Sequence, residues 1–281
     1  MSSQQIRVYE PRGHQKGFFM VVRAMFRDLF SSLDLAKRLF IRDIKAEYRQ
    51  SLLGILWAFL TPLATAFTWI FLSASGAVNI AGTDIPYPLF VFIGTLVWSI
   101  FADSVNTPLQ QTTSAKALIS KINFPKEAIL MASCYKLLFN SGIKIAIIAV
   151  VSIGFGYYSI LGLCGFLLTL VLIMAFGYSL GLLLTPMGML YKDIGRMIPV
   201  ALPFLMFLAP VVYPGARIAA LQNFIELNPM TPLINSSRDL LTGGSFYNPT
   251  YMWIIVGVTL LIGFVGWLIY RVSIPIVVER M

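Results

Sequence analysis

The sequence predicts an all-α integral membrane protein, and three observations support this fold class. Hydrophobic residues make up 58% of the 281-residue chain and only 12% of its residues are charged, whereas soluble domains average about 25% charged residues. Several apolar runs approach the ~20 residues that a helix needs to cross a bilayer core. The first such run begins only after residue 50, so we expect no cleavable signal peptide.

The net charge of +9 could indicate nucleic acid or the membrane itself as a partner. Much of the excess lies in the N-terminal region and in short loops, where Lys and Arg set membrane topology. We find no basic and aromatic motif typical of nucleic-acid binding, so we expect no nucleic acid as a partner. Cys134 and Cys164 are isolated in apolar sequence, which is typical of small core residues.

Six apolar segments are long enough, or nearly so, to cross a bilayer, and we expect six transmembrane helices. Residues 1–50 should form a cytoplasmic tail and an interfacial helix, residues 51–276 the six-helix transmembrane domain, and residues 277–281 a cytoplasmic tail. The six expected spans are residues 52–75, 87–106, 137–155, 160–184, 198–212 and 251–270.

The distribution of Lys and Arg predicts that both termini lie in the cytoplasm. Residues 1–50 contain ten Lys and Arg against five Asp and Glu. The loops after the second and fourth spans are also basic, whereas the loop after the first span has no Lys or Arg. Because cytoplasmic loops carry the excess of Lys and Arg, we expect a multi-pass protein of the cytoplasmic (inner) membrane.

A charged amphipathic segment, residues 33–48, directly precedes the first span. Its apolar residues are interleaved with Lys37, Arg38, Arg42 and Lys45. This pattern is typical of a helix in the membrane interface with its cationic side toward anionic headgroups, so membrane lipids are an expected partner. One interpretation is a surface anchor, and the other is part of a docking surface for a second protein.

The loop between the second and third spans, residues 114–130, is basic and too polar to cross the membrane. Pro125 suits the first position of a helix, and Glu127 in the same turn favours the positive end of the helix dipole. We therefore expect a short basic helix that starts at Pro125 and points away from the membrane. By pattern alone, an ordinary loop helix is the simpler interpretation.

The longest external connection, residues 213–250, predicts two short helices that dip into the outer leaflet and return. Residues 216–224 can form the first helix, and Asn228-Pro229 then breaks the chain. Thr231 suits the N-cap of the second helix, with Pro232 next, and a pair of glycines should end it. Irregular backbone at that depth needs protein or water beside it, which places the segment near a cavity.

Two helix faces are rich in aromatic residues. In the first span the face comprises Trp57, Leu60, Ala64, Phe67 and Phe71, and in the fifth span Phe204, Phe207 and Val211. An aromatic face most often packs helices together, but it can also offer a stacking platform to the apolar C–H faces of sugar rings. Both interpretations stay open at this point.

Three charged residues lie in or beside the expected spans: Asp103, Lys136 and Lys144. A charge at mid-bilayer costs ~2.5–3.5 kcal/mol. A long side chain near a helix end lowers this cost by reaching the interface. That behaviour explains all three residues, and the alternative for Lys144 is contact with an anionic lipid carrier in an aqueous vestibule.

The sequence contains no P-loop, no metal-ligand spacing of Cys and His, and no pair of carboxylates within the expected spans. We therefore expect no catalytic residue, no metal site and no cofactor in this chain. If the protein moves a solute uphill, the energy must come from another chain.

Three motifs resemble those of the ABC-2 family of transporter permeases. The junction Arg-Asp-Ile-Lys … Tyr-Arg-Gln-Ser … Leu-Gly-Ile-Leu-Trp at residues 42–57 resembles the start of these permeases. The run Leu-Ile-Ser-Lys-Ile-Asn-Phe-Pro-Lys-Glu at residues 118–127 resembles their coupling-helix region. The Asn-Pro … Arg segment at residues 228–238 resembles the segment before their last helix. Within the family, the chain looks most like the polysaccharide exporters of O antigen, teichoic acid and capsule (Wzm-like, TagG-like and KpsM-like permeases).

The resemblance implies the membrane subunit of an ABC exporter, a homodimer with two copies of an ABC ATPase subunit that bind ATP and Mg. The implied substrate is a lipid-linked polysaccharide such as an O antigen. The implied ATPase-coupling residues are Lys121, Phe124, Pro125, Lys126 and Glu127, joined by Arg42, Lys45 and Arg49 of the interfacial helix. The candidate channel or substrate residues are Trp57, Leu60, Phe67, Phe71, Phe204 and Phe207, with Lys144 added for the anionic carrier. The implied external gate comprises Pro214, Gly215, Asn228, Pro229 and Arg238.

Two alternatives remain at this point. An ABC-2 exporter of drugs or small lipids would share the fold, although the aromatic faces favour a glycan. An ion-coupled secondary transporter usually carries buried carboxylates in its spans, and these are scarce here.

Overall fold

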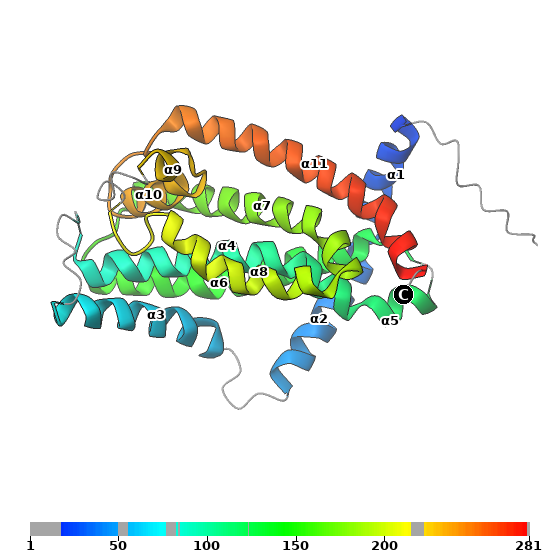
Figure 1. The fold of residues 1–281 in the computed structure, drawn as a ribbon, viewed down its shortest axis with the longest axis horizontal. Coiled ribbons are helices and arrows are strands. Elements are labelled where there is room, and N and C mark those ends of the chain that lie inside the picture. Colours follow the sequence, from blue (N-terminus) through cyan, green and yellow to red (C-terminus); the bar gives the residue numbers. More distant parts are fainter. Residues whose placement is uncertain are drawn as a thin grey trace, which may run out of the picture.

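The computed structural model describes residues 18–49, 56–76, 83, 85–122, 124–214 and 222–279. Within these residues every regular element is a helix (Figure 1). In chain order the helices are α1 (Phe18–Ser31), α2 (Leu33–Arg49), α3 (Trp57–Ala74), α4 (Tyr87–Ser114), α5 (Lys116–Lys121), α6 (Glu127–Gly154), α7 (Ile160–Leu190), α8 (Lys192–Leu205), the 3₁₀ turn η2 (Met206–Leu208), α9 (Gln222–Leu227), α10 (Met230–Leu241) and α11 (Pro249–Glu279).

The six helices α3, α4, α6, α7, α8 and α11 run lengthwise along the molecule (Figure 1). Helices α1, α2 and α5 lie toward the end of this bundle that carries the last turns of α11, which we call the α5 end. Helices α9 and α10 lie at the opposite end, which we call the α10 end. The segments expected to be cytoplasmic and external are therefore separated by the length of the bundle.

Four helices are long and apolar enough to cross a membrane: α4, α6, α7 and residues Pro249–Ile274 of α11. This confirms an all-α integral membrane fold for the described residues. The two remaining expected spans correspond to shorter helices, α3 and α8. The 18 residues of α3 rise roughly 27 Å at 1.5 Å per residue, close to the thickness of a bilayer core. The assignment of α3 and α8 as spans stays a prediction.

Four spans extend at the α5 end well beyond the expected boundaries. Helix α4 continues to Ser114, α6 already begins at Glu127, α7 continues to Leu190, and α11 continues to Glu279. An apolar window marks only the hydrocarbon part of a span. A helix that is already formed propagates through polar residues at little cost, so it projects out of the membrane.

Helix α8 departs from the expected span 198–212 at both of its ends. It begins six residues earlier, at Lys192, and ends at Leu205 before the turn η2. Ala209 after that turn is extended, with φ −127° and ψ 152°. Ala209 precedes Pro210, and a residue before proline is disfavoured in helical conformation. The proline therefore explains why the helix does not reach residue 212.

Helix α4 forms the centre of the bundle and packs against α7 through small residues. Ten consecutive α4 residues, 89–98, are buried. On α7, a Cβ at Gly177 would lie 2.8 Å from the Cβ of Ser104, and a Cβ at Gly181 would collide with the Val105 carbonyl oxygen. The spacing Gly-x-x-x-Gly thus lets the two backbones approach closely, as is common between membrane helices.

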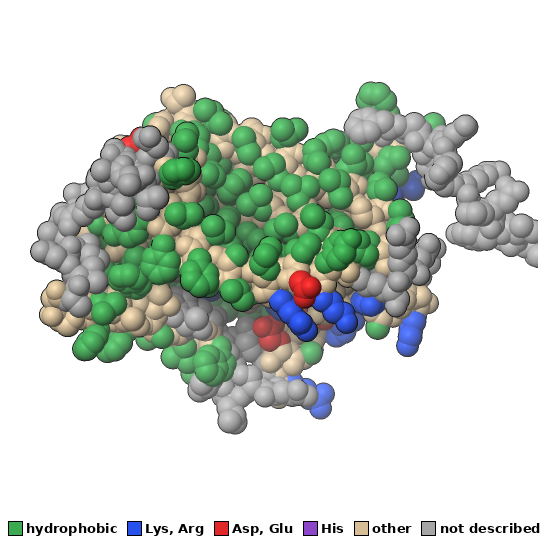
Figure 2. All heavy atoms as spheres, viewed as in Figure 1, with side chains coloured by type: hydrophobic (Ala, Val, Ile, Leu, Met, Phe, Trp, Pro, Cys, Tyr) green, Lys and Arg blue, Asp and Glu red, His purple; other side chains and the backbone are tan. Residues whose placement is uncertain are grey.

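Charge and apolar surface are segregated on the molecule. Figure 2 shows hydrophobic side chains over the middle of the bundle, whereas the visible Lys and Arg gather over α2 and toward the α5 end. Large apolar side chains such as Leu161, Trp253 and Leu260 are exposed. An exposed apolar belt of this kind fits a hydrocarbon environment.

Candidate functional site

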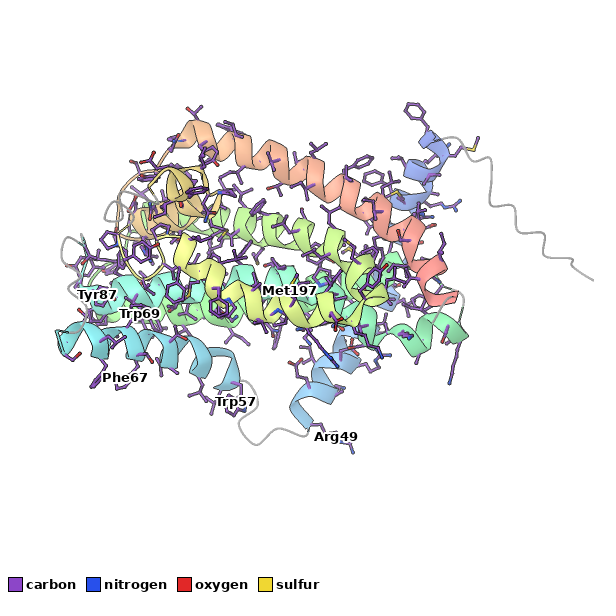
Figure 3. All side chains as sticks on the ribbon, in the orientation of Figure 1. Arg49, Trp57, Phe67, Trp69, Tyr87 and Met197 are labelled. Carbon is purple, nitrogen blue, oxygen red and sulfur yellow. The ribbon has the colours of Figure 1, made fainter. Side chains whose placement is uncertain are left out.

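The aromatic face of α3 points away from the rest of the bundle. Trp57, Phe67 and Phe71 are exposed, and Figure 3 shows Trp57 and Phe67 on the outer side of α3. Leu60 is half-buried and Ala66, on the opposite side of the helix, is buried. The spacing in the sequence therefore identifies residues that share one surface, and this surface has no cover within the described chain.

Helix α8 presents a second apolar face beside α3. Met197, Val200, Phe204 and Phe207 are exposed, and the Phe207 ring lies 5.9 Å from the ring of Trp69 on α3. Val211 does not extend this face, because it is fully buried and lies beyond the end of the helix. The two expected aromatic faces thus lie on neighbouring helices, which the sequence alone could not show.

Lys144 is a member of a buried ion pair and does not reach the α3–α8 surface. Its ammonium group donates to Asp103 Oδ2 and to Ser99 Oγ, each at 2.6 Å. The Lys144 side chain is 4% exposed and that of Asp103 is 38% exposed. The two acceptors, Asp103 and Ser99, belong to α4, so these contacts of Lys144 join α6 to α4. The charge of Lys144 is already paired with Asp103 in this conformation. Binding of an anionic carrier by Lys144 therefore stays a prediction.

The structure corrects the helix expected to start at Pro125. The short basic helix is α5, which ends at Lys121, and the residues after Pro125 form the first turn of α6. No helix-breaking residue follows Pro125, so the helix that begins there continues into the membrane. The segment from α5 through Lys126 is therefore one compact connection between α4 and α6, and we call residues 116–126 the coupling segment.

Residues of the coupling segment differ in their access to a partner. Lys121 and Ile122 are exposed, whereas Phe124 is half-buried and packs against the core. The Lys126 ammonium lies 5.3 Å from the centre of the Phe124 ring and donates to the Phe124 carbonyl oxygen at 3.2 Å. Burial lowers the pKa of Lys126, and the carboxylate of Glu127 opposes this effect. Only part of the predicted coupling set is thus available on the surface.

Helix α2 is fastened to α6 and exposes its cations. The Lys136 ammonium lies 2.9 Å from Glu47 Oε2 of α2. Arg42, Lys45 and Arg49 are exposed along the same helix. Arg42 pairs with Asp43 at 2.7 Å, and all three cations lie at the surface, where lipid headgroups or a partner protein could reach them.

Arg238 of α10 holds the backbone that follows α8. Its guanidinium donates to the carbonyl oxygen of Pro210 at 2.6 Å and to that of Val211, and it covers the Phe90 ring of α4. Burial lowers the pKa of Arg238 to about 9, opposed by the neighbouring Asp239, so the side chain stays charged at neutral pH.

Three further donors complete this clamp. Asn228 Nδ2 donates to the Leu208 carbonyl oxygen at 2.8 Å, and Tyr87 donates to that of Val212 at 3.1 Å. The Tyr213 hydroxyl donates to the Phe207 carbonyl oxygen. We call Arg238, Asn228, Tyr87 and Tyr213 the carbonyl clamp, because they donate to backbone carbonyl groups of residues 207–212, in the turn η2 and the segment that follows α8.

The rest of the external segment, residues 213–250, agrees only partly with the two short helices expected from the sequence. Helix α10 begins at Met230, after Pro229, and ends before Gly243, whose φ is +95°. Pro214 is half-buried, whereas Gly215 and residues 216–221 of the expected first helix lie outside the described residues. Tyr87, Phe90 and Gly94 were missed by sequence reasoning. The only signal for them was a small residue, Gly94, inside a run of bulky apolar residues.

The described residues thus define a helical membrane protein with four long apolar helices, the short helix α5 at one end and the short helices α9 and α10 at the other. The sequence profile of the ABC-2 type transporter membrane family matches residues 35–242. The chain belongs to that family.

Three curated relatives show which members of the family this chain resembles. The chain is 26% identical over 216 residues to the O-antigen export system permease protein RfbA of Myxococcus xanthus, covering 75% of this chain and 82% of the relative. It is 24% identical over 233 residues to the protein of the same name from Klebsiella pneumoniae, covering 82% and 88%. It is 23% identical over 236 residues to the polysialic acid transport protein KpsM of Escherichia coli, covering 83% and 91%. These similarities confirm the resemblance to polysaccharide exporters.

Proposed function

We propose that this chain is the permease subunit of an ABC exporter that carries a lipid-linked polysaccharide across the cytoplasmic membrane. The observation that carries the proposal is the similarity, over most of the chain, to permeases named for O-antigen and polysialic acid export. A separate ATPase subunit would supply the energy, since the sequence has no P-loop.

The open apolar surface of α3 and α8 supports a homodimer with the conduit between the two copies. Trp57, Phe67 and Phe204 are exposed on this surface, and Trp69 of α3 contacts Phe207 in the turn η2 that follows α8. A second copy placed against it would bury part of the surface and leave an aromatic-lined path at the seam. Flat rings there would stack on sugar units regardless of the identity of each sugar, which suits passage of a long glycan.

The coupling segment supports a mechanical drive at the α5 end. In the proposed assembly this end faces the cytoplasm, in agreement with the excess of Lys and Arg. Ala117, Ser120, Lys121 and Ile122 are exposed on it, and α6 begins directly after it. Closure of the ATPase dimer on ATP and Mg would push the segment and shift α6 against α4.

The experiment purifies the chain in mild detergent together with the ATPase encoded by the neighbouring gene. ATP hydrolysis is measured with and without the permease, and proteoliposomes then report the ATP-dependent passage of a fluorescent polyprenyl-linked glycan. An ATPase whose P-loop Lys is replaced serves as the control. We expect a stable complex and export that ceases with the control ATPase. Export that continues without ATP hydrolysis, or the absence of any complex, would contradict the proposal.

A further inference from the structure

One guanidinium at the α5 end joins three helices. Arg271 of α11 donates to Asp28 Oδ2 of α1 at 2.6 Å and to Glu127 Oε1 of α6. The Glu127 side chain is 3% exposed, whereas Asp28 and Arg271 are about one-fifth exposed. Ion pairs at buried sites are screened by salt much less than surface pairs. The two carboxylates therefore hold Arg271 from two sides.

Neighbouring contacts tie the same helices together. The Phe26 ring of α1 meets the Trp267 ring of α11 edge-on, with centroids 5.2 Å apart. Tyr270, next to Arg271, is buried, and its hydroxyl lies 3.3 Å from Thr112 Oγ1 of α4. Helix α11 also contacts α5. Arg271 thus stands where α11 meets α1 and the first residue of α6, which directly follows the coupling segment.

The position of these residues in the chain adds a second argument. The family profile covers residues 35–242, so Asp28 lies before the matched region and Arg271 lies after it. Glu127 lies inside the region and is the first residue of α6, directly after the coupling segment. The two carboxylates and the guanidinium therefore connect the central family region to both of its flanking segments.

We propose that Arg271 is a positioning residue that transmits displacement of the coupling segment to α11 and α1. Guanidinium nitrogens in a fixed planar fork can hold two carboxylates at once, which a single ammonium point charge does less well. When the segment moves, Glu127 moves with α6, and Arg271 draws α11 and α1 along. This transmission rests on the proposed function, which supplies the ATPase that moves the segment.

The variants are chosen to keep the fold. Arg271→Gln alone leaves Glu127 buried without its partner, which destabilises a protein strongly. The double variant Glu127→Gln/Arg271→Gln replaces both buried charges by amides and removes that penalty. Arg271→Lys tests the fork geometry. Arg23→Gln removes a cation from an exposed site of α1 and is the matched control.

The first measurement is amide hydrogen exchange of α1 in the purified permease, which needs no ATPase. We expect exchange in residues 18–31 to rise about fivefold or more in the double variant and to stay at the parent rate in Arg23→Gln. An unchanged exchange rate in the double variant would overturn the link between Arg271 and α1, whatever the partner of the protein is.

The second measurement is the amount of glycan exported per ATP hydrolysed in proteoliposomes. In the double variant we expect an export ratio lower by about fivefold or more, whatever its rate of ATP hydrolysis. The export ratio of Arg271→Lys should lie between that of the parent and that of the double variant. A parental ratio in the double variant overturns the transmission role while the proposed function stands. If the parent permease binds no ATPase, both the proposed function and the transmission role are overturned. Hydrogen exchange still decides whether Arg271 links α11 to α1.

Discussion

The guanidinium carbon of Arg238 lies 3.6 Å from the centre of the Phe90 ring, with the ring on one side and two backbone carbonyl groups at its edge. This stacking joins α10 to α4 and brings the cation to the chain that follows α8. Gly94, one turn further along α4, makes room for it, because a Cβ there would collide with the guanidinium and with the Val211 carbonyl oxygen. The gate residue expected from the sequence is thus a buried structural cation.

Replacing Arg238 by Lys should destabilise the permease although the charge is kept. A single ammonium group cannot serve both carbonyl groups and stack on the Phe90 ring at the same time. Loss of one charged hydrogen bond and the stacking should cost on the order of 2–3 kcal/mol. Thermal unfolding in detergent measures the loss, with the exposed Arg196→Lys as control. Equal melting temperatures for the two variants would show that the carbonyl clamp does not depend on the planar guanidinium of Arg238.

Substituting Gly94 by Ala should also destabilise the permease, because Gly94 of α4 lies directly against the Arg238 guanidinium. The added methyl group displaces the Arg238 guanidinium and leaves a buried charge without its partners, so the melting temperature should fall. Gly142→Ala on α6 is the matched control, because a Cβ there meets no atom within 4 Å. That control should be neutral or stabilising by up to ~1 kcal/mol, the difference in helix propensity. A Gly94→Ala protein as stable as Gly142→Ala would contradict the close approach.

Trp57→Ala should reduce glycan export without affecting assembly with the ATPase. An aromatic stacking partner contributes about 0.5–1.5 kcal/mol, so export should fall by about threefold to tenfold. Trp253→Ala on α11 is the control, because Trp253 is 76% exposed and Trp57 58% exposed, yet Trp253 lies on a helix away from the proposed conduit. Proteoliposome export compares the two variants. Normal export by Trp57→Ala would mean that the α3 face only packs against a neighbour.

Replacing Lys121, Phe124 and Lys126 together should uncouple transport while the chain still inserts into the membrane. Because Phe124 packs against the core and supports Lys126, the single variant Lys121→Ala reports surface contact alone. We expect the triple variant to lose export and Lys121→Ala to weaken ATPase binding. Lys192→Ala, another exposed cation of the same side, serves as the control in the copurification assay. Full ATP-dependent export by the triple variant would exclude this segment as the coupling surface.

The two partners of the Asp103–Lys144 pair should differ in their sensitivity to replacement. Asp103→Asn leaves a buried ammonium unpaired and should cost about 3–5 kcal/mol. Lys144→Met leaves Asp103, whose side chain is 38% exposed and can be solvated, so its cost should be smaller. Unfolding of the two purified variants under the same conditions gives the comparison. A Lys144→Met protein that is the less stable of the two would refute the assignment of the buried partner.

The sequence predicts the membrane class, a helix over the central part of each of the six expected spans, and the α3 stripe, because all of these depend on local hydrophobicity and spacing. It does not locate the ends of the spans. Helix α4 continues eight residues beyond the expected boundary, to Ser114, and passes through Pro108 on the way. The spacing places Val211 on the same helix face as Phe204 and Phe207, but the extended residue before Pro210 removes it from the helix.

Residues in long-range pairs escaped sequence reasoning for a different reason. Lys144 is separated from Asp103 by 41 positions and Arg271 from Asp28 by 243 positions. No periodicity in the chain records such pairs, because they depend on which helices lie side by side. The pairing of Lys144 with Asp103 and the burial of Glu127 beside Arg271 therefore could not be predicted from the sequence.

The carbonyl clamp also bears on how the protein is made. Of its donors, Arg238 and Asn228 are synthesised well after the segment that follows α8, so the newly made end of that segment, residues 207–212, has neither partner at first. A nascent chain should hold this end in water or against the insertion machinery until α10 arrives. We therefore expect chains that stop before residue 228 to be retained by the insertion machinery or degraded, even though all the residues of α8 are present.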